Sequence, residues 1–597
     1  MPGCSGKIIG VYLGRNFEGW PHERVMAELG EVNYYTNEHF GQPLVVTDDD
    51  ISGTFTFLRA LADNGNNRDL TAAQIGDSWL NYLIEERAIL WWGGLGMSTE
   101  HTAFLRLKAG IQAPESGSIG LNSQVIAEQI GAQIFIDGWA MVAPGDPELA
   151  ADLARRAASV SHDGEAIYGA QVIAAMESLA FVEPDLDRLL DTGLSFIPID
   201  STIARLIGDL REWRGRSADW RETFRRVEQR YGYDRYLGSC HIVPNHAIVI
   251  LALLHGDDDF QRTLMIANTC GWDTDCNSGN VGCLMGIKNG LAGIDKGPDW
   301  RGPVADRMYV SSADGGESIT DAVREAAKVI NIARALTGEP EVEPGPRFNF
   351  GFPGAVQGFR SDGAPDARGV ATLENVEHGD GRSLAIDFRG VAPGRVARVI
   401  TPTFIPPSDL AMERYSLLAC PTLYPGQTIR ASVSASGTNA QPVDCRLIVR
   451  VYDELNGLTA LHSEAATLEP GAAGQIAWRI PDTSGQPIAD VGLEVVSGSP
   501  VDGRILLDWL DWSGAPEVTL ASPSAGTAWQ RAWVNGADRV EWNNPHPHRV
   551  IQNQGTGLLI QGTRDWRDYR ATTTVIPEMT ARAGLAVRSR ACGAITP

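Results

Sequence analysis

The spacing of hydrophobic residues divides the chain into two parts of different character. Up to about residue 338, apolar residues recur at steps of three and four, as at Ile126, Ile130 and Ile134, which is the period of an α-helix. Joints rich in glycine and aspartate separate these runs, and the apolar/polar alternation of strands is scarce. The pattern predicts an all-α domain over residues 1–340.

The pattern changes at the Pro- and Gly-rich stretch GEPEVEPGPRFNFGFPG, which is typical of a linker. Short alternating runs follow, such as TIRASVSAS, DCRLIVRVYD and GRILLDWLDW, and these predict a β-sandwich over residues 341–515. The last run resembles the closing strand of galactose-binding-like or carbohydrate-binding jelly rolls. Residues 516–597 contain GLLIQGTRDWRDYRATTTVIP, which resembles the start of a concanavalin-like sandwich. We expect this third domain to be incomplete.

Composition narrows the function classes. A chain of 597 residues is too long for one hydrophobic core, and its formal net charge of -24 argues against a nucleic-acid partner. No stretch is apolar for the roughly 20 residues that a membrane span requires, and the first residues lack a signal-peptide pattern. We therefore expect no membrane partner and a cytoplasmic location. The eight cysteines form no CxxC pair, so we expect free thiols.

Two aspartate clusters are the candidate chemistry of the helical half. Asp48, Asp49 and Asp50 directly precede a predicted helix, whereas Asp273 and Asp275 lie on a turn that leads into another helix. Adjacent carboxylates repel one another, so a packed cluster needs a cation to neutralise it. Ligand sets made only of oxygen favour hard ions, with Mg²⁺ first and Mn²⁺ as the alternative.

The late cluster resembles a motif of the ADP-ribosylglycohydrolases. That family carries Gly-x-Asp-Thr-Asp-Thr, and this chain has Gly271, Trp272, Asp273, Thr274 and Asp275 in the same order. Cys276 takes the place of the final threonine. The resemblance covers roughly residues 8–336 and implies an all-α glycohydrolase domain that binds two magnesium ions, with Asp273, Asp275 and Cys276 as candidate ligands.

The early cluster resembles the family's Thr-Asp-Asp-Thr motif in two registers. One register takes Thr47, Asp48 and Asp49 as the family triplet. The other is shifted by one residue, makes Asp49 and Asp50 the family aspartates, and keeps the downstream helix free of gaps with Thr54 on the later threonine. We prefer the shifted register, and Thr47 and Asp48 remain candidate metal ligands.

A third stretch resembles the family loop Gly-Asn-Gly-Ala-x-Met-Arg and the histidine-bearing helix after it. Gly131, Gln133 and His162 take the matching places, and the resemblance implies that they bind substrate. Where the family has Met-Arg, this chain has isoleucine followed by Phe135, so a guanidinium that could face a phosphate is missing.

Two further residues of this loop suit a sugar. Asp137 could form hydrogen bonds with a sugar and Trp139 could stack on it. We therefore expect Phe135, Asp137 and Trp139 to complete the substrate-binding set.

The leading hypothesis is metal-dependent hydrolysis of an N- or O-glycosidic bond to ribose or a related sugar. Asp49, Asp50, Asp273 and Asp275 are its candidate catalytic residues, and one of them or Glu38 would be the general base. The first alternative is a hydrolase of glycans or nucleosides that does not act on ADP-ribosylated protein. The second is a non-catalytic protein that binds a sugar or a nucleotide.

Overall fold

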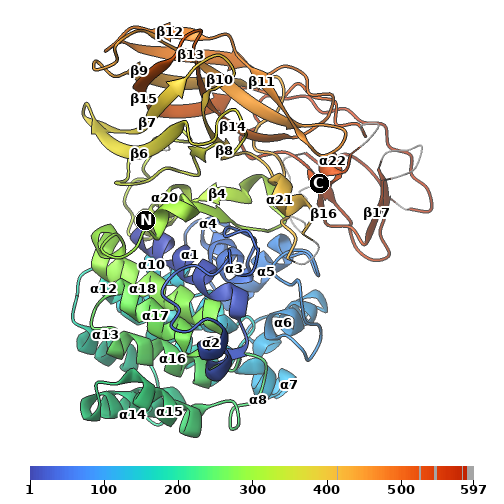
Figure 1. Ribbon diagram of the computed structural model, residues 1–597. Helices are drawn as coiled ribbons and strands as arrows, with labels where there is room; N and C mark the ends of the chain where they lie inside the picture. The colour runs from blue at the N-terminus through green and yellow to red at the C-terminus, as the bar shows by residue number, and fades with distance from the viewer. Residues whose placement is uncertain (344, 413–414, 523–525, 543–547, 581, 588–597) are drawn as a thin grey trace. The chain divides into compact units, whose positions relative to one another are not determined.

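The structure is a computed structural model that describes residues 1–343, 345–412, 415–522, 526–542, 548–580 and 582–587. It separates into two compact units, drawn as blue-to-green helices and yellow-to-red strands in Figure 1. The helical unit comprises Met1–Val304, Met308–Val310 and Ala322–Val342. The strand-rich unit comprises Ala305–Arg307, Ser311–Asp321 and the described residues from Glu343 onward. The predicted order of a helical half followed by a strand-rich half is confirmed.

The helical unit is built almost entirely from helices. Its elements are α1 (Pro2–Gly14), η1 (Arg15–Phe17), β1 (Trp20–Pro21), α2 (His22–Glu28), α3 (Asp49–Phe57), α4 (Arg59–Asp63), α5 (Ala72–Tyr82), α6 (Thr99–Lys108), η2 (Glu115–Gly117), α7 (Ile119–Asn122), α8 (Gln124–Ala127), α9 (Gly131–Ile134), α10 (Asp137–Met141), α11 (Pro147–Ala158), α12 (Glu165–Ala180), α13 (Leu186–Leu194), α14 (Thr202–Arg216), α15 (Trp220–Tyr231), α16 (Ile242–His255), α17 (Phe260–Thr269), β2 (Gly271–Trp272), α18 (Thr274–Ile294), α19 (Arg301–Val304) and α20 (Ala322–Leu336). A short strand, β3 (Arg307–Tyr309), lies where the chain passes between the units.

Small residues let α1 and α18 approach closely. A Cβ atom added to Gly10 would lie 1.9 Å from the carbonyl oxygen of Ser278, and one added to Gly6 would lie 1.9 Å from that of Gly282. The Ser278 hydroxyl also donates a hydrogen bond to the Gly10 carbonyl at 2.7 Å. Since neither helix leaves room for a larger side chain here, this contact sets where the first turn of α18 lies.

The central helices are buried all round. In α16, the run IVPNHAIVILALLH is buried at all but one position, and α18 is buried from Thr274 to Ile287. Outer helices such as α13 and α15 instead alternate apolar and charged residues, which is typical of a helix with one face toward solvent. The polar residues inside the central helices therefore need partners within the unit.

The strand-rich unit contains a sandwich of two antiparallel sheets. One sheet has the order β13-β9-β15-β7-β6, and the other has the order β11-β10-β14-β8-β5, with β12 also paired to β10. Inward-facing residues such as Val433, Leu447 and Leu507 form its core. The strands and short helices are η3 (Gly315–Glu317), β4 (Ile319–Asp321), β5 (Arg360–Ser361), β6 (Ala371–His378), β7 (Gly381–Val391), β8 (Ala397–Pro402), α21 (Pro407–Leu410), β9 (Thr428–Ala435), β10 (Val443–Tyr452), β11 (Leu458–His462), β12 (Ala466–Leu468), β13 (Ala473–Arg479), β14 (Ile488–Val496), β15 (Val501–Ser513), α22 (Ala528–Arg531), β16 (Val534–Asn535), β17 (Arg539–Glu541), β18 (Arg549–Ile551) and β19 (Leu559–Ile560).

The helical unit ends at Val342, but the chain also crosses between the units earlier. The Asp306 carboxylate accepts hydrogen bonds from the backbone N–H groups of Val356 and Gln357 at 2.6 and 3.0 Å. Residues 305–307 and 311–321 therefore belong to the strand-rich unit. A separate third domain over residues 516–597 stays a prediction.

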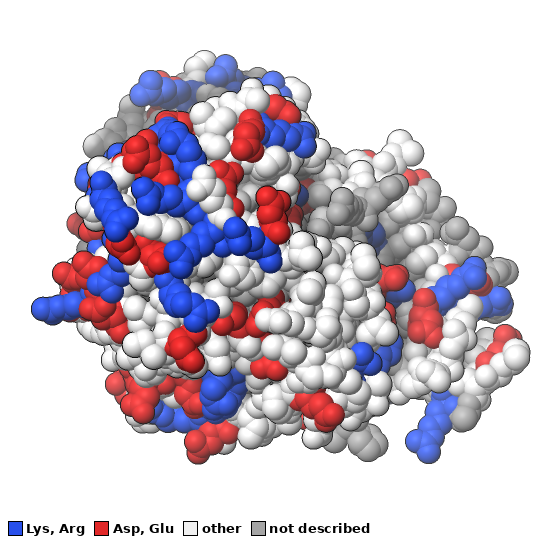
Figure 2. Space-filling model, turned by 90° about the horizontal axis from the view of Figure 1, so that it is seen from below, with Lys and Arg blue, Asp and Glu red and all other residues white. Residues whose placement is uncertain are grey.

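Three further features of the chain are its cysteines, its surface charge and the apolar character of its helices. The seven cysteines of the described residues are free, and Cys592 lies outside that part of the chain. Acidic and basic side chains are interspersed on the face drawn in Figure 2. Where the structure describes the chain, none of its helices combines the length and apolar character needed to cross a membrane.

Candidate active site

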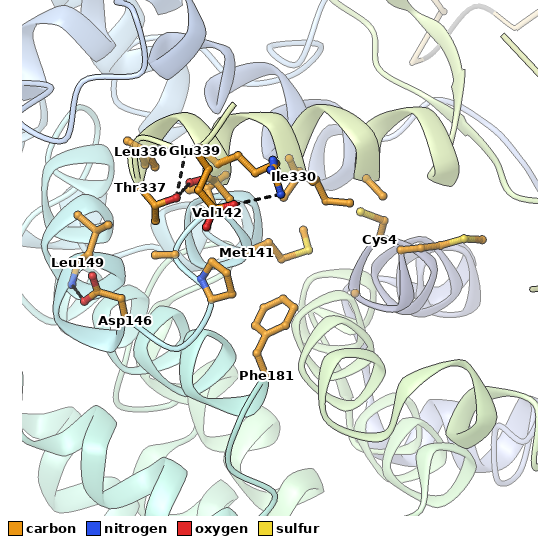
Figure 3. Close-up of a pocket in the computed structure, with 18 of the residues that line it drawn as sticks. Cys4, Met141, Val142, Asp146, Leu149, Phe181, Ile330, Leu336, Thr337 and Glu339 are labelled. Atoms are coloured by element: carbon orange, nitrogen blue, oxygen red, sulfur yellow. Dashed lines mark hydrogen bonds and ion pairs between the residues drawn. The ribbon is translucent and has the colours of Figure 1, made fainter. Parts of the chain in front are cut away.

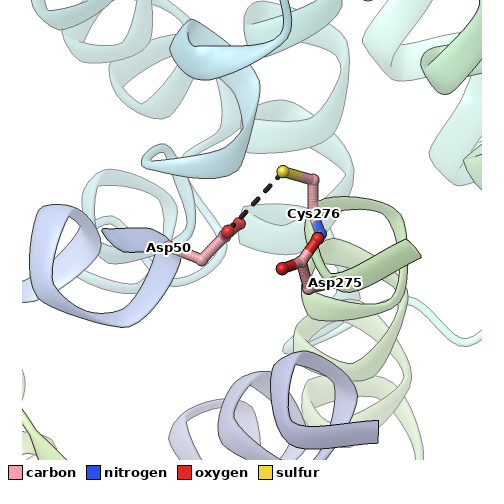
Figure 4. A group of neighbouring side chains, drawn as sticks. All are labelled: Asp50, Asp275 and Cys276. Carbon is pink, nitrogen blue, oxygen red and sulfur yellow. Dashed lines mark hydrogen bonds between the residues drawn. The ribbon is translucent and has the colours of Figure 1, made fainter. Parts of the chain in front are cut away.

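The two aspartate clusters meet at one place in the helical unit. The Asp48 side chain caps α3 by accepting from the backbone N–H of Asp50 at 3.0 Å, and Asp275 lies in the first turn of α18. The thiol of Cys276 donates to Oδ2 of Asp50 at 3.5 Å, although 226 residues separate them (Figure 4). Single ligand atoms of Asp50, Asp275 and Cys276 lie within 4.8 Å of one another. Asp48, Asp49 and Asp50 form a second such group.

A glutamate that the sequence analysis missed joins this site. Ligand atoms of Glu18, Asp273 and Asp275 also lie within 4.8 Å of one another. β1 and β2 place Glu18 there, because Trp20 pairs with Trp272 and Gly19 donates to the Trp272 carbonyl at 2.7 Å. The run GVYLGRNF just before Glu18 offered no local sign of this long-range pairing.

The glycine of the late motif has a steric reason. Gly271 has a φ of +77°, and a Cβ atom there would lie 2.4 Å from the carbonyl oxygen of Trp20. Any other residue would therefore clash and would also strain the backbone. Gly271 thus allows the strand pair that brings Glu18 to Asp273.

Burial and mutual repulsion dominate the electrostatics of the cluster. Burial raises the pKa of Asp273 well above its usual value, and the carboxylate of Asp275 raises it further. The pKa of Asp275 is raised by burial and by Glu18, and that of Asp50 by burial and by Asp275. A cluster of this kind is costly to ionise unless positive charge is brought to it.

The side chains present fit a divalent cation. Neither carboxylate oxygen of Asp273 and only one oxygen of Asp50 receives a hydrogen bond from the described residues, although both side chains are buried. Oxygen donors that are buried and unpartnered suit hard cations such as Mg²⁺ or Mn²⁺. Asp48, Asp49, Asp275 and Glu18 supply further oxygens, and Cys276 would be the softest ligand of the set.

One buried cation already lies beneath the cluster. The Lys7 ammonium is fully buried, donates to the Ile134 carbonyl at 2.8 Å, and lies 2.8 Å from Asp137 and 3.9 Å from Asp50. Burial lowers the pKa of Lys7, but Asp137 and Asp50 outweigh it, so the net shift is upward and the ammonium stays charged. Arg15 supplies a second positive charge near Asp48, where it partly offsets the effect of burial on the aspartate pKa.

The predicted loop residues lie next to one another but are largely enclosed. A Cβ atom on Gly131 would lie 1.6 Å from the Glu100 carboxylate and 3.0 Å from the His162 ring, so glycine is required. His162 accepts from the backbone N–H of Ala132 at 3.3 Å, and burial lowers its pKa to about 3. His162 is therefore neutral and holds the loop rather than carrying charge.

Gln133 belongs to a buried hydrogen-bond network. Its side-chain amide donates to Asn280 of α18 at 3.1 Å, and its carbonyl oxygen faces Nδ1 of His246 at 2.7 Å. Asn280 in turn donates to Asp137 at 2.7 Å. The network ties the loop to α16 and α18, so Gln133 and Asp137 have structural partners.

Four of the predicted residues lie in the core or outside the candidate metal groups. Trp139 is 1% exposed and Phe135 is 5% exposed, so both rings lie in the core. Phe135 packs across Gly53 of α3 and forms a T-shaped pair with Phe57, with the ring centroids 5.1 Å apart. Glu38 is exposed and belongs to none of the candidate metal groups of the described residues, whereas Glu18 does. Thr47 is buried beside Asp48 and is in none of these groups either.

A separate cavity of about 420 Å³ lies at the start of α1 (Figure 3). Apolar side chains such as Met141, Phe181 and Ile330 line most of it, with Cys4 among them. None of the predicted site residues lines it.

Comparison with known proteins shows the family of the chain. The family model for ADP-ribosylglycohydrolase matches residues 3–337, and the chain belongs to that family. Among solved structures, an ADP-ribosylglycohydrolase-related protein complex is 18% identical with a TM-score of 0.38, covering 56% of this chain and 97% of that one.

Solved carbohydrate-binding modules are similar to about a quarter of the chain. The CBM22-1 xylan-binding domain from Paenibacillus barcinonensis Xyn10C is 12% identical with a TM-score of 0.20, covering 28% of this chain and 90% of that one. The family 11 carbohydrate-binding module from Clostridium thermocellum is 12% identical with a TM-score of 0.19, covering 28% and 94%. No curated protein matches the chain significantly. The family supports a glycohydrolase-type function.

Proposed function

We propose that this chain is a divalent-metal-dependent glycohydrolase that cleaves a glycosidic bond to ribose or a related sugar. The observation that carries the proposal is the convergence on one site of carboxylates from α3, from the start of α18 and from Glu18, which follows η1. Among them, Asp273 has both carboxylate oxygens without a hydrogen-bond donor in the described residues. This arrangement favours cation binding over a purely structural role.

The carboxylates of the site have two proposed roles, metal binding and proton transfer. Asp49, Asp50, Asp273 and Asp275 would hold two Mg²⁺ ions, with Mn²⁺ as the alternative, and Glu18 shares the group of Asp273 and Asp275. When bound, such ions orient sugar hydroxyls and polarise water. A carboxylate held beside that water can accept its proton, and the exposed Glu18, whose ligand atom lies within 4.8 Å of those of Asp273 and Asp275, is our candidate for that role.

The second candidate function is hydrolysis of an uncharged glycoside or nucleoside. Phe135 takes the place of the arginine in the family's loop motif, and its ring packs on Gly53. A charge-assisted contact to a phosphate, worth about 1.5–3 kcal/mol, is therefore not available from this position.

One experiment tests the function and separates the candidates. The full-length protein is incubated with Mg²⁺ and with ADP-ribosyl-arginine, ADP-ribose, nucleosides and a panel of pentosides, and free sugar is measured. Release from ADP-ribosyl-arginine supports the leading reading, whereas release only from uncharged substrates supports the second. Metal binding without release from any of these compounds would favour a non-catalytic sugar-binding protein.

A further inference from the structure

A tyrosine-bearing loop lies beside the carboxylate cluster and has no role in the function proposed above. Residues 232–241 connect α15 to α16 and carry the half-buried Tyr233. The far end of the loop is held in place, because Ile130 donates to the Cys240 carbonyl at 2.8 Å and Cys240 donates to the Gln129 side chain at 3.0 Å. The loop is thus attached to the segment that precedes Gly131.

Asn245 of α16 links Tyr233 to the cluster. Its carbonyl oxygen accepts from the side chain of Asn277 at 3.1 Å and from the backbone N–H of Asp273 at 3.4 Å. Its amide nitrogen donates to the His241 carbonyl at 3.0 Å and to the Tyr233 hydroxyl at 2.8 Å. These four contacts allow only one orientation of the amide.

The orientation of Asn245 determines what the Tyr233 hydroxyl can do. Because the amide nitrogen donates, the hydroxyl oxygen is the acceptor in that bond and its own hydrogen is left over. Within the described part of the chain, no acceptor takes this hydrogen. Burial and the nearby Asp273 carboxylate raise the pKa of Tyr233 well above its usual value, so the group remains a donor at neutral pH.

The surroundings of Tyr233 suit an uncharged, partly apolar ligand. The ring meets that of Trp272 at 5.4 Å with an interplanar angle of 84°. Trp272 is half-buried and directly precedes Asp273. Aromatic faces of this kind pack against the C–H groups of a sugar, while a hydroxyl donor recognises one of its oxygens.

We propose that Tyr233 is a substrate-binding residue that donates a hydrogen bond to a sugar oxygen held next to Asp273, with Asn245 as its positioning residue. The inference rests on the proposed glycohydrolase function and extends it by naming a specificity determinant. In this proposal the neutral hydroxyl of Tyr233 and the rings of Tyr233 and Trp272 recognise the substrate. Such groups select a sugar ring rather than a charged leaving group.

The test is Tyr233→Phe in the full-length protein, which removes one oxygen and keeps the ring against Trp272. Tyr236→Phe is the matched control, because Tyr236 lies on the same loop and its ring contacts Tyr231 and His241 instead. Calorimetry with Mg²⁺ alone measures the metal site. Calorimetry with D-ribose, 2-deoxy-D-ribose and 3-deoxy-D-ribose at saturating Mg²⁺ measures the sugar site.

We expect Tyr233→Phe to weaken D-ribose binding about three- to tenfold, the value of one neutral hydrogen bond. Mg²⁺ affinity should stay within twofold, and Tyr236→Phe should match the wild type in both titrations. For the deoxy sugar that lacks the recognised oxygen, wild type and Tyr233→Phe should bind with equal affinity. Equal D-ribose affinity of Tyr233→Phe and wild type would overturn the inference alone. Failure of the wild type to bind any of these sugars, with Mg²⁺ bound normally, would overturn the proposed function and the inference with it.

Discussion

At the scale of single residues, the site is defined by charge that the fold buries without compensating it fully. Lys7 contributes one positive charge beneath Asp50, whereas the cluster gathers carboxylates from three segments of the chain. Since burial raises the pKa of Asp273 and Asp275, each carboxylate destabilises the metal-free protein when it ionises. Removing one of these carboxylates should therefore stabilise the metal-free protein and weaken its metal binding.

Asp273→Asn should separate these two effects. We expect the metal-free variant to unfold at a higher temperature than the wild type, because one buried charge is gone with little change in volume. Turnover should fall more than about a hundredfold, since several kcal/mol of metal-assisted stabilisation are lost. Asp275→Asn should behave alike, and Asp295→Asn, at the exposed end of α18, should not. Thermal unfolding with EDTA or Mg²⁺, together with the sugar-release assay, measures both effects. Wild-type turnover in Asp273→Asn at ordinary Mg²⁺ would rule out a ligand role.

His162 makes stability depend on pH. Burial lowers its pKa to about 3 in the folded protein, whereas an unfolded histidine titrates near 6.5. Between those values the unfolded chain binds the proton and the folded chain does not. The stability from this residue is therefore complete above pH 6.5 and decreases as the pH falls.

Comparison with His162→Gln isolates that contribution. The wild-type free energy of unfolding, relative to the variant, should drop by up to about 1.4 kcal/mol per pH unit below pH 6.5. Urea denaturation of both proteins at pH 7, 6 and 5 gives the difference. Parallel pH profiles of the two proteins would show that His162 binds its proton equally well in the folded and the unfolded chain, which would contradict the lowered pKa.

At the scale of elements, the α1–α18 contact aligns the site. Thr274 donates to the Gly14 carbonyl at 2.8 Å, and Gly6 and Gly10 allow the two backbones to touch below it. Glu18 follows α1 and Asp275 begins α18. The distance between these helices therefore decides whether the two carboxylates can share a cation.

Gly10→Ala tests this contact, with Gly208→Ala as the matched control. The added methyl group at position 10 would lie 1.9 Å from the Ser278 carbonyl oxygen, so we expect a loss of about 1–3 kcal/mol and weaker Mg²⁺ binding. At Gly208 in α14 nothing lies within 4 Å, and alanine should stabilise that helix by about 1 kcal/mol. Urea denaturation and Mg²⁺ titration measure both variants. Equal stability of the two would mean that the helices move apart without cost.

At the scale of the whole molecule, the chain enters the strand-rich unit before the helical unit is complete. Ala305 accepts a hydrogen bond from Gly358 at 2.7 Å, and Gly315 accepts one from Cys420 at 2.9 Å. Both belong to short segments that precede α20, the last helix of the helical unit. A truncation after residue 342 would therefore leave residues 305–307 and 311–321 without the rest of their unit.

Asp306→Ala examines this crossing. The variant leaves the N–H groups of Val356 and Gln357 without their acceptor and places alanine at a φ of +59°, so we expect a loss of about 1–3 kcal/mol. Asp306→Asn should lose less, because asparagine keeps an acceptor oxygen and tolerates that conformation. Calorimetric unfolding of the full-length protein compares them. Identical stability of Asp306→Ala and the wild type would contradict the proposed role.

The sequence by itself determined the features that depend on local patterns. The spacing of apolar residues distinguished the helical half from the strand-rich half, because the direction of side chains repeats with the period of the backbone in each element. The motif around Gly271 identified Asp273 and Asp275, since the turn and the helix start are encoded in neighbouring residues. The resemblance of Asp49 and Asp50 to the family motif was equally local.

Only the tertiary structure decided which distant residues share the site. Glu18 rather than Glu38 reaches Asp273, because a strand pair and a contact between small residues bring α1 against α18. Phe135 and Trp139, which we expected to contact substrate, lie in the core because neighbouring helices cover them. Such proximities arise from packing between elements far apart in the chain, and no short run of sequence carries them.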